Sequence, residues 1–154
     1  MKKITYALCI GIFITAFGTA RFTHAALGEP AESVMSDRKA ISADSSATTV
    51  RNGYTIQEII SDSVSVREYI SPSGVVFGIA WSGLIHPDLT LLLGSYAGEY
   101  QEALKQTTRK HGRRFSQVRT NRVVVEKWGH MRHLQGRAYA PALIPSGVSI
   151  DEIE

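Results

Sequence analysis

Two histidines near the carboxyl end of the chain are the best candidates for metal chemistry. His130 and His133 lie three residues apart, and His86, Asp88 and His111 occur elsewhere. Zinc sites use histidine and carboxylate ligands in sets of three or four. Two histidines three apart share a face of a helix, but they point to opposite faces of a strand. Because this region is predicted to be turn and strand, we expect surface or hydrogen-bonded histidines and no metal site.

The sequence offers little for nucleophilic catalysis. Gly94-Ser95-Tyr96-Ala97-Gly98 places its serine one position too early for a nucleophile elbow. Cys9 is the only cysteine, and it lies in the N-terminal apolar run. Glu58, Glu68 and Glu126 fall singly on predicted strands, and isolated carboxylates of this kind are usually solvated. We therefore predict no catalytic residue and no cofactor.

A basic segment over residues 105–122 is the most distinctive surface feature. Residues 105–137 contain 10 basic residues and 1 acidic residue, whereas residues 26–104 contain 4 basic and 10 acidic residues. Six cations surround Phe115: Arg109, Lys110, Arg113, Arg114, Arg119 and Arg122. Basic residues interleaved with an aromatic can bind a polyanion. The alternative is a solvated basic loop that faces the acidic half of the fold.

Other binding candidates lie at strand ends and in the last predicted hairpin. Trp81 and Trp128 each end a predicted strand beside a glycine turn, where an aromatic either packs in the core or anchors a ligand. The complete set of predicted binding residues is Trp81, His86, Asp88, Arg113, Arg114, His130, Arg132, His133 and Arg137.

The N-terminus has the pattern of a secretory signal peptide. Lys2 and Lys3 precede an apolar run from Ile4 to about Phe17, and Thr23-His24-Ala25 supplies small residues for cleavage after Ala25. The alternative is an uncleaved anchor, but a membrane-spanning helix needs about 20 apolar residues, and this run is shorter. Processing leaves 14 basic and 14 acidic residues. We therefore expect an exported protein, periplasmic or extracellular, with no stable transmembrane segment and no nucleic-acid partner.

The mature chain alternates between strand-like and helix-like periods. Apolar residues alternate with polar ones after Gly53 and after Asp62, and Ser71-Pro72-Ser73-Gly74 is a turn before an apolar strand over 75–81. Residues 87–105 carry a helical stripe that Gly94 and Gly98 interrupt, which fits one bent helix or two short ones. The remaining predicted elements are a helix over 27–42, a polar linker over 42–52, a basic connection over 106–117, and strands over 118–128 and 131–139.

This order predicts an α+β fold with an antiparallel sheet of about five strands. A three-strand meander, a helix and a two-strand hairpin would form the sheet, with helices packed on one face. The predicted divisions are a signal peptide (1–25), an N-terminal helix and polar linker (26–52), the α+β domain (53–148) and a C-terminal tail (149–154).

Four motifs in the mature chain resemble a known exported bacterial family, domain of unknown function 2844. They are ALGEP (26–30), REYISPSGVVFGIAWSG (67–83), PDLTLLLGSY (87–96) and GHMRHLQGRAYAPALIPSGV (129–148). The resemblance covers the mature chain, and it is weakest over 105–127. It implies an exported bacterial protein and brings no activity, cofactor or catalytic residue.

Two functional hypotheses follow from these observations. The first is a non-enzymatic binding or accessory module of the cell envelope, whose partner is an envelope protein or an anionic envelope component. The second is a hydrolase or transferase that draws on His86, Asp88, His130 and His133, which requires these residues to converge in one pocket. A structural envelope component is a third alternative.

Overall fold

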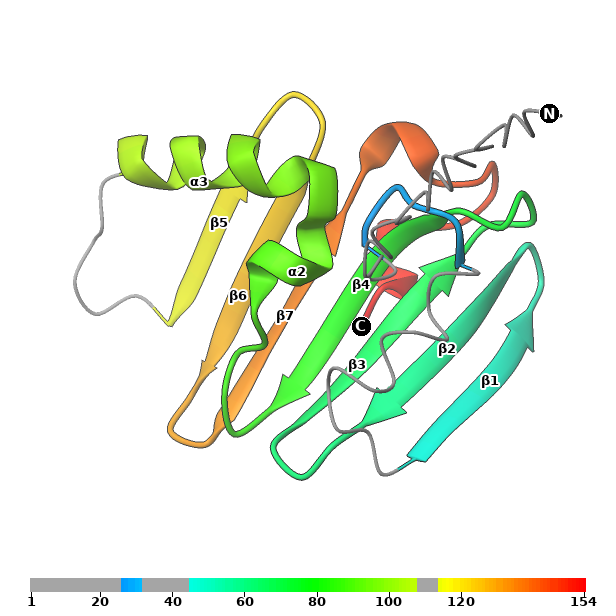
Figure 1. Ribbon diagram of the computed structural model, residues 1–154, viewed down its shortest axis with the longest axis horizontal. Coiled ribbons are helices and arrows are strands. Elements are labelled where there is room, and N and C mark those ends of the chain that lie inside the picture. The colour runs from blue at the N-terminus through cyan, green and yellow to red at the C-terminus, as the bar shows by residue number, and fades with distance from the viewer. Residues whose placement is uncertain (1–25, 32–44, 108–113) are drawn as a thin grey trace, which may run out of the picture.

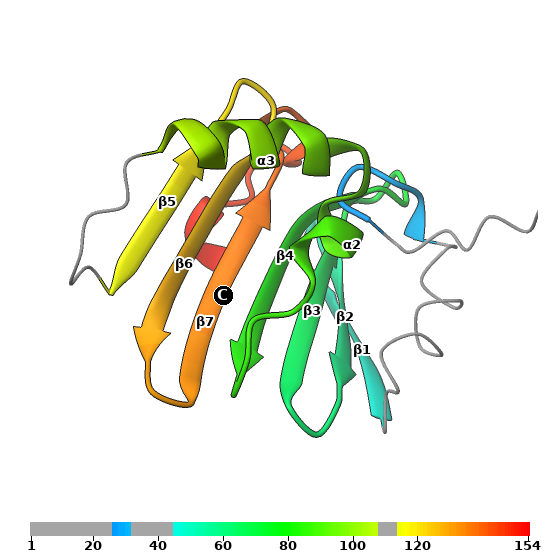
Figure 2. The same cartoon turned by 60° about the vertical axis from the view of Figure 1, so that its left-hand side comes forward.

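The protein is built on one antiparallel sheet of seven strands, in the order β1-β2-β3-β4-β7-β6-β5 (Figures 1 and 2). The structure is a computed structural model that describes residues 26–31, 45–107 and 114–154. Two meanders, β1 to β4 and β5 to β7, meet where β4 pairs with β7. The strands are β1 (Ser45–Arg51), β2 (Tyr54–Ile60), β3 (Val64–Ile70), β4 (Val76–Gly83), β5 (Phe115–Arg119), β6 (Val124–His130) and β7 (His133–Tyr139).

The predicted fold class is wrong. Over the described residues the protein is mostly β, with seven strands rather than five, and the α-helices of this part of the chain lie in the connection between β4 and β5. The strands β2 and β3, which carry alternating apolar residues, and the apolar strand β4 lie where the sequence predicts them. The error comes from two strands that this pattern does not reveal.

The first of these is β1, which replaces the predicted polar linker. Six of its seven residues are exposed, so its sequence carries no apolar alternation. Backbone pairing with β2 holds it in the sheet, from Ser45 opposite Ile60 to Arg51 opposite Tyr54. An alternating apolar pattern arises because one face of a strand is buried, so this pattern does not predict a strand without buried side chains.

The second is β5, which the sequence merges with β6 into a single strand over 118–128. The chain instead turns at 120–123 and returns as β6. Thr120 and Val123 close this turn: the Thr120 amide donates to the Val123 carbonyl at 2.9 Å, and the Thr120 hydroxyl accepts from the Val123 amide at 3.0 Å. A side chain bonded to nearby backbone in this way stabilises a turn at little cost.

The connection between β4 and β5 forms two short helices, one of the two arrangements that the sequence allowed. They are α2 (Leu89–Leu93) and α3 (Ala97–Gln106), joined by a 3₁₀ turn, η2 (Gly94–Tyr96). Gly94 ends α2 with φ 49°, a backbone conformation that glycine adopts without steric cost. The connection lies over one face of the sheet, which we call the helix face (Figures 1 and 2).

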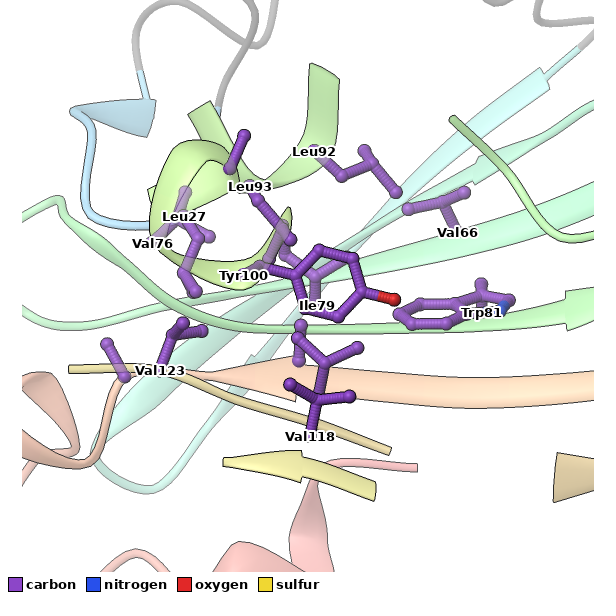
Figure 3. Packing of buried hydrophobic residues seen from close by; sticks show 14 of the residues in the cluster. Leu27, Val66, Val76, Ile79, Trp81, Leu92, Leu93, Tyr100, Val118 and Val123 are labelled. Atoms are coloured by element: carbon purple, nitrogen blue, oxygen red, sulfur yellow. The ribbon is translucent and has the colours of Figure 1, made fainter. Parts of the chain in front are cut away.

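Two apolar clusters lie on opposite faces of the sheet. On the helix face, Leu92, Leu93 and Tyr100 pack with Ile79 and Trp81 of β4 (Figure 3). The other cluster gathers residues that alternate with these along the strands, and residues 140–154 cover it; we call this side the C-terminal face. Its members are Tyr54, Tyr69, Phe77, Ala80, Val124, Tyr139 and Ile153.

Both ends of the described chain are integral to the domain. Leu27 is fully buried, and its amide donates to the Leu92 carbonyl at 2.9 Å. Residues 26–31 form a turn and an isolated bridge from Pro30 to Val75; the rest of the helix predicted over 27–42 lies outside the described residues. At the other end, the predicted tail folds as η4 (Ile150–Glu152), after η3 (Pro141–Leu143). Across the described ranges, no helix is both long and apolar enough to span a membrane.

Candidate functional site

The pairing of β4 with β7 aligns a row of charged side chains across the C-terminal face. Reading from β2 to β6, the opposed residues are Glu58, Arg67, Ala80, Arg137 and Glu126. Arg67 donates to Glu58 at 2.9 Å, and Arg137 donates to Glu126 at 2.6 Å. Two ion pairs therefore flank the small side chain of Ala80.

The prediction that the glutamates on the strands are solvated is wrong for two of them. Glu126 is 7% exposed, and Glu68 on the helix face is 1% exposed.

The end of the chain is fastened over this row. The Arg67 Nη1 donates to the main-chain oxygen of Glu154 at 3.0 Å, and the Arg137 Nη1 donates to the carbonyl of Ile150 at 3.0 Å. The Ile153 side chain is fully buried in the apolar cluster of the C-terminal face. Tyr69 also donates to the Glu154 oxygen, at 2.8 Å. These contacts cover the part of the face nearest the start of β4.

Burial and hydrogen bonding shift the pKa values of the side chains that hold the chain end in place. Burial raises the pKa of Tyr69, and it raises the pKa of Tyr54, which also donates to Glu152 at 2.8 Å. The Ser149 amide, followed by the Tyr54 hydroxyl, lowers the pKa of Glu152 by stabilising its carboxylate. The two tyrosines therefore stay protonated, as donors to the chain end.

The next row across the same face is not covered. Its opposed residues are Ser65, Ser82, Gln135, Trp128 and Phe115, from β3 to β5. A groove of about 200 Å³ opens along this row. Its lining residues are Ser65, Arg67, Ala80, Trp81, Ser82, Trp128, Gln135, Gly136 and Glu154.

Trp128 is held by its neighbours in this row. Its Nε1 donates to the Gln135 Oε1 at 2.8 Å, and the Arg137 guanidinium lies 6.0 Å from the centre of its ring. In the described part of the chain, no hydrogen bond occupies the Ser82 hydroxyl or the Gln135 Nε2. The groove therefore presents an oriented indole beside a hydroxyl and an amide that are available to a ligand.

His130 and His133 lie at the end of the β6–β7 hairpin, directly opposite one another. The two-residue turn between them holds Met131 at φ 24° and Arg132 at φ 63°, as a tight hairpin turn requires. The argument that the two imidazoles point apart is wrong, because they belong to two paired strands, and opposed residues project from the same side of a sheet. Within the described ranges, no three histidine, cysteine or acidic side chains are grouped closely enough to hold a metal ion.

Trp81, His86 and Asp88 belong to the helix face and its helical connection. The Trp81 Nε1 donates to the His86 Nδ1 at 3.0 Å, and burial lowers the pKa of His86. Asp88 caps α2 by accepting from the Thr90 amide at 2.8 Å. Each of these polar side chains has a structural partner, and the tryptophan is 3% exposed.

Part of the basic segment is engaged by the helices. Arg122 lies over the ring of Tyr96 at 4.4 Å and is 3.8 Å from the Glu99 carboxylate. Arg114 is exposed beside Phe115, whereas Arg113 lies outside the described residues. Of the predicted binding residues, the structure therefore brings Arg137, His130 and His133 to the C-terminal face, with Arg132 at the adjoining turn.

The groove residues that sequence reasoning missed are Ser65, Arg67, Ser82 and Gln135. Along β7, Gln135 lies on the same polar face as His133 and Arg137. The serines give no such signal, because small hydroxyl residues are common in turns and on solvated strands alike. Only the strand register places them in one row with Trp128.

By its fold, the protein belongs to the class of antiparallel β-sheet proteins. One face of the sheet is apolar and lies under helices, and the other face is half covered and carries polar and aromatic side chains. Residues 23–153 match the family described as "Protein of unknown function (DUF2844)". The chain therefore belongs to this family, as its sequence motifs predict. No curated protein and no solved structure matches it.

Proposed function

We propose that the protein is an exported, non-enzymatic binding module of the cell envelope, and that its ligand binds in the groove on the C-terminal face. One observation supports this most directly. The row from Ser65 to Phe115 remains uncovered beside a row that residues 140–154 cover, and it combines an oriented indole with available polar groups. Binding sites commonly pair apolar or aromatic lining with a few positioned polar groups.

The His/Asp-based enzyme has less support. His86 accepts a hydrogen bond from Trp81, and Asp88 caps a helix, so both side chains already have structural roles. His130 and His133 are exposed at a hairpin end. A recognition surface accounts for these positions without requiring the four residues to meet in one pocket.

The groove can be tested by nuclear magnetic resonance on protein purified after expression of the full chain. Envelope polysaccharide, anionic phospholipid vesicles and a mixture of short peptides would be added separately. We expect at least one of them to shift the Trp128 indole and Gln135 side-chain amide signals. If none does so, or if the shifts lie only elsewhere, the groove is not the binding site.

A filled groove provides the matched test. Ser82→Phe places an aromatic ring in the groove, whereas Val50→Phe places one on exposed β1, where Val50 is 78% exposed. We expect Ser82→Phe to remove the shifts and Val50→Phe to leave them. Equal behaviour of the two variants, both shown to be folded by circular dichroism, would contradict the proposal.

Export is tested separately by intact-mass measurement after expression of the full chain in a Gram-negative host. We expect the exported protein to lack residues 1–25, since small residues occupy the two positions that signal peptidase reads before the cut. Recovery of protein that retains Met1 would contradict this part of the proposal.

A further inference from the structure

The polar groups that the groove offers to a ligand are uncharged, and the arginines nearby are already in ion pairs. Ser82 offers a hydroxyl and Gln135 offers its Nε2, while Arg67 and Arg137 are each paired with a carboxylate. A phosphodiester polyanion is bound mainly through many available lysines and arginines along its path. Hydroxyl and amide groups beside an indole suit a ligand that carries many hydroxyls and an apolar ring face.

The groove is small and open along its row. At about 200 Å³, it lies below the ~300–1,000 Å³ that is usual for sites that enclose a drug-sized ligand. Phe115 continues the row beyond Trp128 and is 48% exposed. These dimensions fit one ring-sized unit of a longer chain, with the neighbouring unit passing over the Phe115 side chain.

Charge is distributed unequally between the two ends of this surface. Glu154 lines the groove at the end nearest the covered row. Arg132 and Arg114, together with the two hairpin histidines, lie toward the β6–β7 turn and the start of β5, and all four are exposed. These charges therefore favour one orientation of a ligand that carries a single negative charge, in which that charge lies toward the hairpin and away from Glu154.

We infer that the ligand is an anionic polysaccharide, one uronic-acid residue of which occupies the groove. The apolar face of its pyranose ring stacks on Trp128, and its hydroxyls bond to Ser82 and Gln135. Its carboxylate faces the hairpin end with Arg132. This inference rests on the proposed function of the groove, and it adds the chemical class of the ligand.

The experiment compares hexagalacturonate with the neutral galactose hexamer, which differs only at the carboxylates. Binding is measured by calorimetry and by tryptophan fluorescence at 20 and 200 mM salt. We expect the uronate to bind at least ~10-fold more tightly than the neutral sugar, and to weaken at least ~3-fold at the higher salt, because exposed charges are screened over about 10 Å. Equal affinity for the two sugars would overturn the inference.

Variants assign the binding to the groove. Trp128→Ala removes the stacking surface. We expect it to weaken the binding of hexagalacturonate at least ~10-fold, which corresponds to about 1.4 kcal/mol. Trp128→Phe keeps an aromatic face without the bond to Gln135, and it is expected to stay within ~3-fold of the wild type. Val50→Phe is the unaffected control. Tight binding that survives Trp128→Ala in a folded protein would overturn the inference.

Two further probes separate failure of the ligand class from failure of the groove. Oligothymidylate would stack its bases on Trp128 and Phe115, and phosphatidylglycerol vesicles would present phosphate without a ring. If either one binds in the groove and the uronate does not, the ligand class is wrong and the groove remains a binding site. If no probe reaches the groove, and the mixture of short peptides does not reach it either, this inference and the proposed function both fail.

Discussion

The ion pair between Arg137 and Glu126 provides the sharpest test of the packing on the C-terminal face. The two side chains are 19% and 9% exposed and meet at 2.6 Å. Arg137→Met leaves the Glu126 carboxylate largely buried and removes the donor to Ile150 and Ile153. Breaking a buried ion pair by removing one partner costs ~3–5 kcal/mol. Gln117 still donates to Glu126, so we expect a loss of roughly 3 kcal/mol, toward the lower end of that range.

A loss of this size is a large part of the stability of a small domain, which is typically ~5–15 kcal/mol. Urea unfolding followed by circular dichroism should show the midpoint of Arg137→Met lowered by roughly 1–3 M, given a typical urea dependence of ~1–3 kcal/mol per M. Hydrogen exchange adds a local measurement. The amide of Ile153 should exchange faster in the variant, since the chain end loses two of the hydrogen bonds that fasten it.

A double-mutant cycle separates the ion pair from general damage. Glu126→Gln removes the charge that Arg137 compensates, so the variant with both substitutions should be more stable than the sum of the two single losses implies, by at least ~1 kcal/mol. If Arg137→Met costs less than ~1 kcal/mol, or if the two losses simply add, the charged row does not stabilise the fold in the way described.

Three further predictions concern other parts of the fold. Ile153→Ala removes a fully buried side chain at the chain end and should cost ~2–5 kcal/mol in urea unfolding; a loss below ~1 kcal/mol would mean that this segment is not packed as described. Gly136→Ala would place a Cβ 2.3 Å from the Trp81 ring and 2.6 Å from a backbone oxygen, and should destabilise by ~1–3 kcal/mol. Its control, Gly98→Ala in α3, meets nothing within 4 Å and should stabilise by ~0.5–1 kcal/mol; similar effects of the two alanines would contradict the close packing. For His86, burial lowers the pKa from 6.5, so the unfolded chain takes up this proton more readily than the folded protein; stability should fall as the pH drops below 6.5 toward the folded-state pKa. His86→Gln should show less of this dependence in urea unfolding between pH 5 and 8, and an unchanged dependence would contradict the assignment.

Several features of the fold could be predicted from residue types and spacing. The alternation that starts at Tyr54 and at Val64 defines β2 and β3, because each side chain that enters a core leaves a polar neighbour on the opposite face. Gly94 interrupts the helical stripe and divides the connection into α2 and α3. Four motifs also predict the family to which the chain belongs. These features are local, so a single segment is enough to reveal them.

Other features depend on strands that are distant in the sequence. Arg67 and Arg137 come together around Ala80 only because β7 pairs with β4, across a connection that includes two helices and β5 and β6. The register of the β6–β7 hairpin places Arg137 opposite Glu126, and the pairing of β4 with β7 places Ser82 in one row with Gln135 and Trp128. The sequence by itself determined which segments bury apolar side chains. The tertiary structure decided which polar side chains share a row, because strand register is fixed by packing over the whole sheet.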